Sequence, residues 1–187
     1  MIFLDIDGVL NYLPDKPRET VPNFVCQDER CYGLNPALVA QLKRIIEATD
    51  AKIVISSSWR HFHDYLPYQP KRDWRDVLAE RLGMPRKFII IGETPSLVTR
   101  QMDEYGTSEY TLRGREIRQW LEENSKRFDT PITYCILDDE VDDITSVLGK
   151  KRVVHVNYRQ GLTDGDVSKA IRILSGHQHG NRQDQCS

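Results

Sequence analysis

The chain has 187 residues, of which 39% are hydrophobic and 29% are charged, and these values are typical of one globular domain. The formal net charge of −2 excludes a strong overall attraction to nucleic acid, so any basic binding surface must be local. The four cysteines lack the paired spacing of a metal or redox site, which favours a reducing, cytoplasmic location. Asp5 interrupts the first apolar run, so we expect no signal peptide, and no apolar segment is long enough to span a membrane.

Short apolar runs alternate with helical patterns along the chain. The runs predict buried strands at residues 1–4, 52–55, 87–91, 133–137 and 152–156. The apolar periodicity around them predicts helices, the first with Asn35 as its N-cap, at residues 35–48, 74–83, 113–125 and 164–174. Strands that alternate with helices pair in parallel through right-handed crossovers. The predicted fold class is therefore α/β, a three-layer sandwich with a mostly parallel, Rossmann-like sheet.

Two segments are longer than ordinary connections between such elements. Residues 11–34 and 60–72 each follow the end of a predicted strand, and loops of this length in a compact domain are typically functional, so we expect both near the site. No segment is large enough for a complete cap domain over the site. We predict a single domain over residues 1–174 with a minimal cap or none, followed by a polar, disordered tail at residues 175–187.

Acidic side chains follow two of the predicted strands at the points where the strands end. Asp5 and Asp7 come after the first strand, and Asp138 and Asp139 come after the run at residues 133–137. Ligands of open parallel sheets bind outside the carboxyl ends of the strands, so we expect these acids to meet. Asp5 and Asp7 are two residues apart on an extended chain and can face one volume. Four carboxylates need a cation, and hard oxygen ligands favour Mg²⁺ over zinc.

A phosphate monoester is the substrate class that suits this arrangement. The Asp5 carboxylate can attack phosphorus to form an aspartyl phosphate, while Asp7 protonates the leaving oxygen and later activates water. Bound Mg²⁺ would let this anionic nucleophile approach an anionic substrate. The Ser56 hydroxyl, and the Arg113 guanidinium at a helix start, would bind the phosphoryl oxygens. Gly8 permits a tight turn directly after the acids.

The motifs resemble those of the haloacid dehalogenase (HAD) superfamily phosphatases. MIFLDIDGVLN is similar to the first motif of that superfamily, KIVISSSWR to the second, RGREIRQWL to the third and ILDDEVDD to the fourth. They occur in the required order and cover roughly residues 1 to 160. The resemblance implies that Asp5 is the nucleophile, that Asp7 is the general acid and base, and that Ser56 is the serine of the second motif.

The third and fourth motifs leave choices open. For the third motif, the resemblance implies Arg113 as the phosphate-binding cation, with Arg115 as the alternative. For the fourth, it implies either Asp138 or Asp139 as the main metal ligand, with Asp143 in support. More narrowly, the combination of FLDIDGVLN, SSSWR, IIGETP, RGREI-x-x-WL and ILDDE resembles the small HAD domain of Swiss army knife RNA repair proteins. That narrower resemblance implies a phosphorylated nucleic-acid end as a substrate.

Residues near the motifs are further candidates for substrate binding. Ser57 is the alternative to Ser56, Trp59 belongs either to the mouth of the pocket or to the core, and Asp143 either supports the site or caps the next helix. The full set of substrate-binding candidates is Gly8, Ser57, Trp59, Arg60, Arg115 and Asp143. A second set of basic residues forms either a solvated surface or a local nucleic-acid patch, and it consists of Lys71, Arg72, Arg75, Arg86 and Lys87.

The function that follows is a Mg²⁺-dependent phosphomonoester hydrolase. Its substrate is interpreted either as a phosphorylated nucleic-acid end or as a nucleotide or other small phosphate ester. The non-enzymatic alternative is a phosphate- or partner-binding module that keeps the fold without turnover. A binding module does not need the paired nucleophile and acid that Asp5 and Asp7 would provide, which favours the enzyme. Neither a membrane nor an obligate protein partner is implied.

Overall fold

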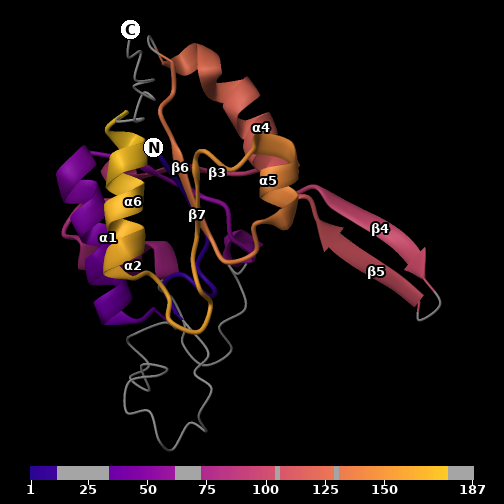
Figure 1. Ribbon diagram of the computed structural model, residues 1–187, viewed down its shortest axis with the longest axis horizontal. Helices are drawn as coiled ribbons and strands as arrows, with labels where there is room; N and C mark the ends of the chain where they lie inside the picture. The colour runs from indigo at the N-terminus through magenta and orange to yellow at the C-terminus, as the bar shows by residue number, and fades with distance from the viewer. Residues whose placement is uncertain (12–33, 62–72, 104–105, 129–130, 177–187) are drawn as a thin grey trace, which may run out of the picture.

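The computed structural model describes residues 1–11, 34–61, 73–103, 106–128 and 131–176. A five-stranded parallel sheet forms its centre, with the strand order β3-β2-β1-β6-β7 (Figure 1). Its strands are β1 (Ile2–Leu4), β2 (Ile53–Ile55), β3 (Ile90–Glu93), β6 (Cys135–Asp138) and β7 (Val153–His155). Leu4 at the end of β1 pairs with Ile55 on one side and Leu137 on the other. The carboxyl ends of these three strands therefore lie next to one another.

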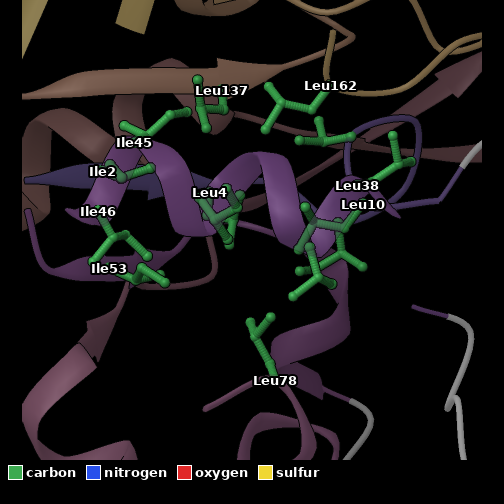
Figure 2. Close-up of a cluster of buried hydrophobic side chains, with 14 of the residues drawn as sticks. Ile2, Leu4, Leu10, Leu38, Ile45, Ile46, Ile53, Leu78, Leu137 and Leu162 are labelled. Carbon is green, nitrogen blue, oxygen red and sulfur yellow. The ribbon is translucent and has the colours of Figure 1, made fainter. Parts of the chain in front are cut away.

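Helices cover both faces of the sheet, which confirms the three-layer prediction. One face carries α1 (Pro36–Thr49), α2 (Trp74–Leu82) and α6 (Asp164–Leu174), and the other carries α4 (Arg113–Asn124) and α5 (Asp142–Leu148) (Figure 1). Successive side chains of a strand point to opposite faces. Ile2 and Leu4 accordingly pack into the cluster beneath α1 (Figure 2), whereas Phe3 makes an edge-to-face contact with Trp120 of α4 at 5.4 Å between ring centroids. The apolar strand β1 is thus buried on both sides.

The predicted helices are confirmed to within two residues at their ends. The Asn35 side chain caps α1 by accepting a hydrogen bond from the Ala37 amide at 2.9 Å. α2 ends at Leu82, and the residue that caps it is Gly83, whose φ of 76° lies in the left-handed region that favours glycine. α6 spans the predicted residues and begins with a capping box formed by Thr163 and Asp166. These local signals lie at fixed offsets along the sequence, so they identify helix ends without knowledge of the tertiary structure.

Two features differ from the prediction, the start of the third strand and a hairpin that was not expected. Residues predicted as a strand at 87–91 begin as a helical turn, α3 (Arg86–Ile89), because periodicity cannot assign so short an apolar run. A hairpin of β4 (Val98–Asp103) and β5 (Gly106–Thr111) projects from the side of the molecule that carries α4 and α5 (Figure 1). Its sequence is polar and gives no strand signal. The helix α5 begins where the alternative interpretation of Asp143 expected the next helix, with Asp142 and Asp143 in its first turn.

Both long loops and the tail fall largely outside the described residues. The first loop is described only at its two ends, and the second only at its start, which forms the 3-10 helix η3 (Ser58–His61). Their expected position near the site, the expected disorder of the tail and the domain limits stay predictions. No helix within the described ranges combines the length and apolar character needed to cross a membrane.

Candidate active site

Three carboxylates gather at the carboxyl ends of the two central strands. Asp5 follows β1, Asp138 is the last residue of β6, and Asp139 follows it. One carboxylate oxygen of each residue lies within 4.8 Å of those of the other two. The parallel pairing of β1 with β6 causes this meeting, and the Asp5 amide donates to the Leu137 carbonyl at 3.0 Å. Asp5 and Asp138 are buried, so water screens their charges only weakly.

Arg113, the first residue of α4, places a positive charge against this cluster. Its Nη1 atom lies 2.9 Å from Oδ1 of Asp5 and 2.9 Å from Oδ2 of Asp138. Burial lowers the pKa of this guanidinium, but the charges of Asp138 and Asp5 outweigh burial and raise the pKa above its ordinary value. Arg113 is therefore a permanent cation that joins α4 to the ends of β1 and β6. The Arg115 side chain is exposed and takes no part in this contact.

The cluster holds more negative charge than Arg113 neutralises. Burial and the nearby Asp5 carboxylate raise the pKa of Asp138 from 3.8 to about 7, although Arg113 acts in the opposite direction. Burial and Asp5 also raise the pKa of Asp139, from 3.8 to about 6. A divalent cation would relieve this repulsion, and a set of three carboxylate oxygens fits Mg²⁺ by its chemistry. Asp5, Asp138 and Asp139 are thus the residues that could hold the metal.

Mg²⁺ is expected to stabilise the folded protein more at about pH 8 than at about pH 5. Carboxyl groups with a raised folded-state pKa bind protons more tightly in the folded than in the unfolded chain. Through Asp138 and Asp139, the metal-free protein should therefore lose stability as the pH rises from about 4 to about 7. Protons also compete with the metal for these groups. Urea unfolding with Mg²⁺ or with chelator at both pH values measures the difference, and an equal gain from Mg²⁺ at both would contradict it.

Gly8 lets the chain turn sharply beside the cluster. Its φ is 70°, a left-handed conformation that side chains disfavour. A Cβ atom at this position would lie only 2.5 Å from the Cγ atom of Asp139. Glycine is therefore required both for the turn after Asp7 and for the close approach of Asp139 to the backbone.

The Asp7 carboxylate lies outside the group of three. Asp7 is exposed, and its two oxygens accept hydrogen bonds from the side chains of Trp59 and Asn11, each at 2.8 Å. Asp7 follows the same strand as Asp5, two residues further along the chain. Metal coordination by the Asp7 side chain stays a prediction, since the residues that the structure gathers with Asp5 are Asp138 and Asp139.

Ser56 follows β2 directly and lies at the end of the strand next to Asp5. Its amide donates to the Leu4 carbonyl at 2.9 Å, and its side chain is fully buried. The Ser56 hydroxyl has no hydrogen-bond partner among the described residues. A buried hydroxyl without a partner costs free energy unless a ligand satisfies it. Ser57 is different, because its hydroxyl already accepts a bond from the Trp59 amide at 3.3 Å inside the turn.

Arg60 lies in the interior and does not face the mouth of the site. Its Nη2 atom is 2.9 Å from both carboxylate oxygens of Glu116 on α4, and its Nη1 donates to the Ser57 carbonyl at 3.0 Å. Glu116 also accepts a hydrogen bond from the Leu97 amide, directly before the hairpin, at 2.8 Å. The pair therefore connects the turn after β2, the helix that carries Arg113 and the base of the hairpin. We accordingly leave Arg60 out of the proposed substrate contacts.

Asp143 acts on the site through α4. Its Oδ2 accepts a hydrogen bond from the Gly114 amide at 2.7 Å, so it satisfies a free donor in the first turn of α4. The two helices approach closely here, because a Cβ atom on Gly114 would lie 2.8 Å from the Asp143 carbonyl oxygen. Asp143 thus caps a helix other than its own and fixes the start of α4, where Arg113 lies.

The candidate basic patch is only partly covered by the described residues, and one of its members lies in the interior. Arg75 is fully buried and forms an ion pair with Glu93 at 2.5 Å. Arg86 forms an ion pair with Asp73 at 2.7 Å. Lys71 and Arg72 lie outside the described residues. The interpretation as a local nucleic-acid surface therefore loses Arg75, which is buried, whereas Arg86 stays partly exposed with its charge paired to Asp73.

A pocket of about 430 Å³ opens beside the carboxylate cluster. Asp139 of the cluster and Arg113, which contacts the cluster, both line the pocket, so a ligand in the pocket can reach the carboxylates. The remaining lining comes from the loop after β6, the start of α5 and the end of β7, with Glu140, Val141, Asp142, Asp143 and His155. The site is therefore open to solvent on the side of α5.

Sequence reasoning missed three residues of this region. Asn11 follows Asp7 at a spacing of four, which carries no signal by itself. His155 ends β7 and is brought to the pocket only by strand order. Glu116 had a usable signal, because it is four residues before Trp120 and therefore shares the apolar face of the helix. A carboxylate on a buried face must have a partner, and Arg60 is that partner.

The sheet, the acidic cluster at the end of its central strands and the arginine at the start of α4 together define a haloacid dehalogenase-like α/β protein. A family model described as "HAD domain in Swiss Army Knife RNA repair proteins" matches residues 1–167, and the chain belongs to this family. This confirms the predicted superfamily and supports a phosphatase-like function at the level of that superfamily. No curated protein and no solved structure matches the chain in the corresponding comparisons.

Proposed function

We propose that the protein is a Mg²⁺-dependent phosphomonoester hydrolase that works through an aspartyl phosphate on Asp5. The observation that carries the proposal is the meeting of Asp5, Asp138 and Asp139 against the guanidinium of Arg113. The buried Ser56 hydroxyl without a partner supports it independently, because a phosphoryl oxygen would satisfy that donor. Mg²⁺ held by the three carboxylates would neutralise the charge that builds up between nucleophile and phosphate.

The reaction proceeds in two steps in which atoms and charges balance. In the first, an oxygen of Asp5 bonds to phosphorus, the bond from phosphorus to the leaving oxygen breaks, and Asp7 gives its proton to that oxygen. In the second, water attacks phosphorus, a proton of this water passes to Asp7, and the bond from phosphorus to Asp5 breaks. Inorganic phosphate leaves, and both aspartates return to their starting states.

The remaining residues bind and orient the phosphoryl group. Ser56 donates its hydroxyl to one phosphoryl oxygen, and Arg113 supplies charge to another while it keeps Asp5 in place. Gly8 lets the backbone after Asp7 lie close to the Asp139 carboxyl group. Ser57 and Asp143 support the turn and the helix that carry these groups, and Arg115 is the candidate for contact with more distant parts of a substrate.

For the substrate class, we propose the phosphorylated end of a nucleic acid. The description of the family, which names RNA repair proteins, supports this class. The open pocket beside Asp139 is compatible with the end of a polymer. The terminal phosphate would lie in the pocket, and the nucleotides that follow it could extend into solvent. A nucleotide or another small phosphate ester is the alternative, and it would need the long loops to cover the site.

Phosphate release measured on three substrate types tests the proposal. The set consists of 4-nitrophenyl phosphate, free nucleotides, and oligonucleotides with a 5′- or a 3′-phosphate, each with Mg²⁺ and with chelator. We expect Mg²⁺-dependent release, with the oligonucleotide ends as the best substrates. Faster phosphate release from free nucleotides than from the oligonucleotides would favour the alternative substrate class, a nucleotide or another small phosphate ester. Phosphate binding without release from any of these would reject the hydrolase in favour of the binding module.

A further inference from the structure

Both carboxylate oxygens of Asp7 are held by side chains outside the carboxylate cluster. Nε1 of Trp59 donates to Oδ2 at 2.8 Å, and Nδ2 of Asn11 donates to Oδ1 at 2.8 Å. Asp7 is exposed, and an exposed carboxylate without such partners samples several rotamers. Two donors that approach from different segments of the chain define one direction for this side chain.

The donor from Trp59 is itself fixed by the core. The Trp59 ring packs edge to face against Trp74, with 5.5 Å between the centroids and an interplanar angle of 89°. Nε1 of Trp74 donates to the Trp59 carbonyl at 3.2 Å, and Trp74 is only 2% exposed. The indole N–H can only donate, so it specifies an acceptor at the position of Asp7. Asp7 is thus linked to the buried side of α2 through two tryptophans.

The donor from Asn11 is fixed by the turn that follows β1. The Gly8 amide donates to Oδ1 of Asn11 at 2.9 Å, which leaves the Nδ2 group of Asn11 directed at Asp7. The two bonds close the turn between Gly8 and Asn11 on itself. The same turn that needs a glycine for its backbone therefore also provides a hydrogen-bond donor to Asp7.

We propose that Trp59 and Asn11 are positioning residues that direct Asp7 toward the leaving oxygen of the substrate. This inference rests on the proposed function, in which Asp7 gives a proton to that oxygen as its bond to phosphorus breaks. Proton transfer from a positioned acid contributes about 10²- to 10⁴-fold to a rate, and most of that gain depends on correct geometry. Residues that orient Asp7 should therefore affect the rate only for substrates whose leaving oxygen must receive a proton from Asp7.

The test compares two substrates whose leaving groups differ in that need. 4-Nitrophenolate is a stable anion and leaves without protonation, whereas the alkoxide of β-glycerophosphate must be protonated as it leaves. For Trp59→Phe we expect kcat/KM to fall by about tenfold or more with β-glycerophosphate and by less than about threefold with 4-nitrophenyl phosphate. The parameter kcat/KM covers the steps up to departure of the leaving group, so the later hydrolysis step does not affect the comparison.

Three further variants make the outcome decisive. Asn11→Ala should give the same selective loss, and Asp7→Asn a larger one. Trp120→Phe, a buried tryptophan far along α4, should change both substrates equally. If Asp7→Asn is selective but Trp59→Phe and Asn11→Ala lower both rates equally, the positioning role is overturned and the proposed function stands. If Asp7→Asn is not selective, or if the wild type releases no phosphate, the acid role of Asp7 and this inference fail together.

Discussion

Replacing Asp5 with asparagine is expected to lower phosphate release by about a thousandfold or more and to leave the fold intact. An amide nitrogen or oxygen cannot form the acyl phosphate that the carboxylate forms, so the first chemical step is lost. The amide fills the same space and its oxygen can still accept the hydrogen bond from Arg113. Release of phosphate from 4-nitrophenyl phosphate in the presence of Mg²⁺ measures the effect.

A matched variant and a chemical trap separate this result from general damage. Asp50→Asn is the matched control, because Asp50 is exposed at the end of α1 and has a φ of 50°, which asparagine tolerates. It should keep wild-type activity. The wild type, quenched during turnover, should carry phosphate that hydroxylamine releases, as expected for an acyl phosphate, and Asp5→Asn should carry none. Full activity of Asp5→Asn, verified by mass as still containing asparagine, would reject Asp5 as the nucleophile.

Replacing Arg60 with alanine is expected to lower the free energy of unfolding by about 3–5 kcal/mol. The change leaves the Glu116 carboxylate fully buried without its cation, and it removes the donor to the Ser57 carbonyl. A domain of this kind has about 5–15 kcal/mol of stability in total, so the loss would be a large part of it. Urea unfolding followed by circular dichroism gives the value.

Arg44 offers a matched control for the Arg60 variant. Arg44 and Asp164 also form an ion pair, but their side chains are 53% and 79% exposed, against 4% and 0% for Arg60 and Glu116. Water screens the exposed pair, so Arg44→Ala should cost less than about 1 kcal/mol. Equal losses in the two variants would show that burial of the Arg60 pair does not govern its contribution.

The fold could be predicted from the sequence because its signals are local. The strand β1 and its neighbours are apolar on both faces, and the helix α1 is marked by Asn35 and Pro36. The hairpin could not be predicted, because its strands are polar and, within the described part of the chain, pair with each other outside the main sheet. Strand order also lies beyond local signals, although it decides that β1 lies in the middle of the sheet.

Part of the candidate site could likewise be predicted from the sequence, and part could not. Asp5, Asp138 and Asp139 follow strands of a parallel sheet, so the rule for strand ends was enough to bring them together. The roles of Trp59 and Arg60 could not be assigned, because neighbours in sequence point to different surroundings in the turn η3. Trp59 contacts Asp7, whereas Arg60 enters the interior to meet Glu116. Only the tertiary structure supplies the partners that distinguish them.

The central place of β1 has a consequence for the time at which the site can form. Ile2 pairs with Cys135, so the first strand of the chain must wait for a strand made much later. During synthesis at the ribosome, Asp5 emerges before Asp138 and Asp139 and meets them only after the segment between them has been translated. Closing so long a loop is entropically costly and slows folding. A nascent chain that stops before β6 would carry Asp5 without the two carboxylates that gather with it, so the acidic cluster can form only once β6 has emerged.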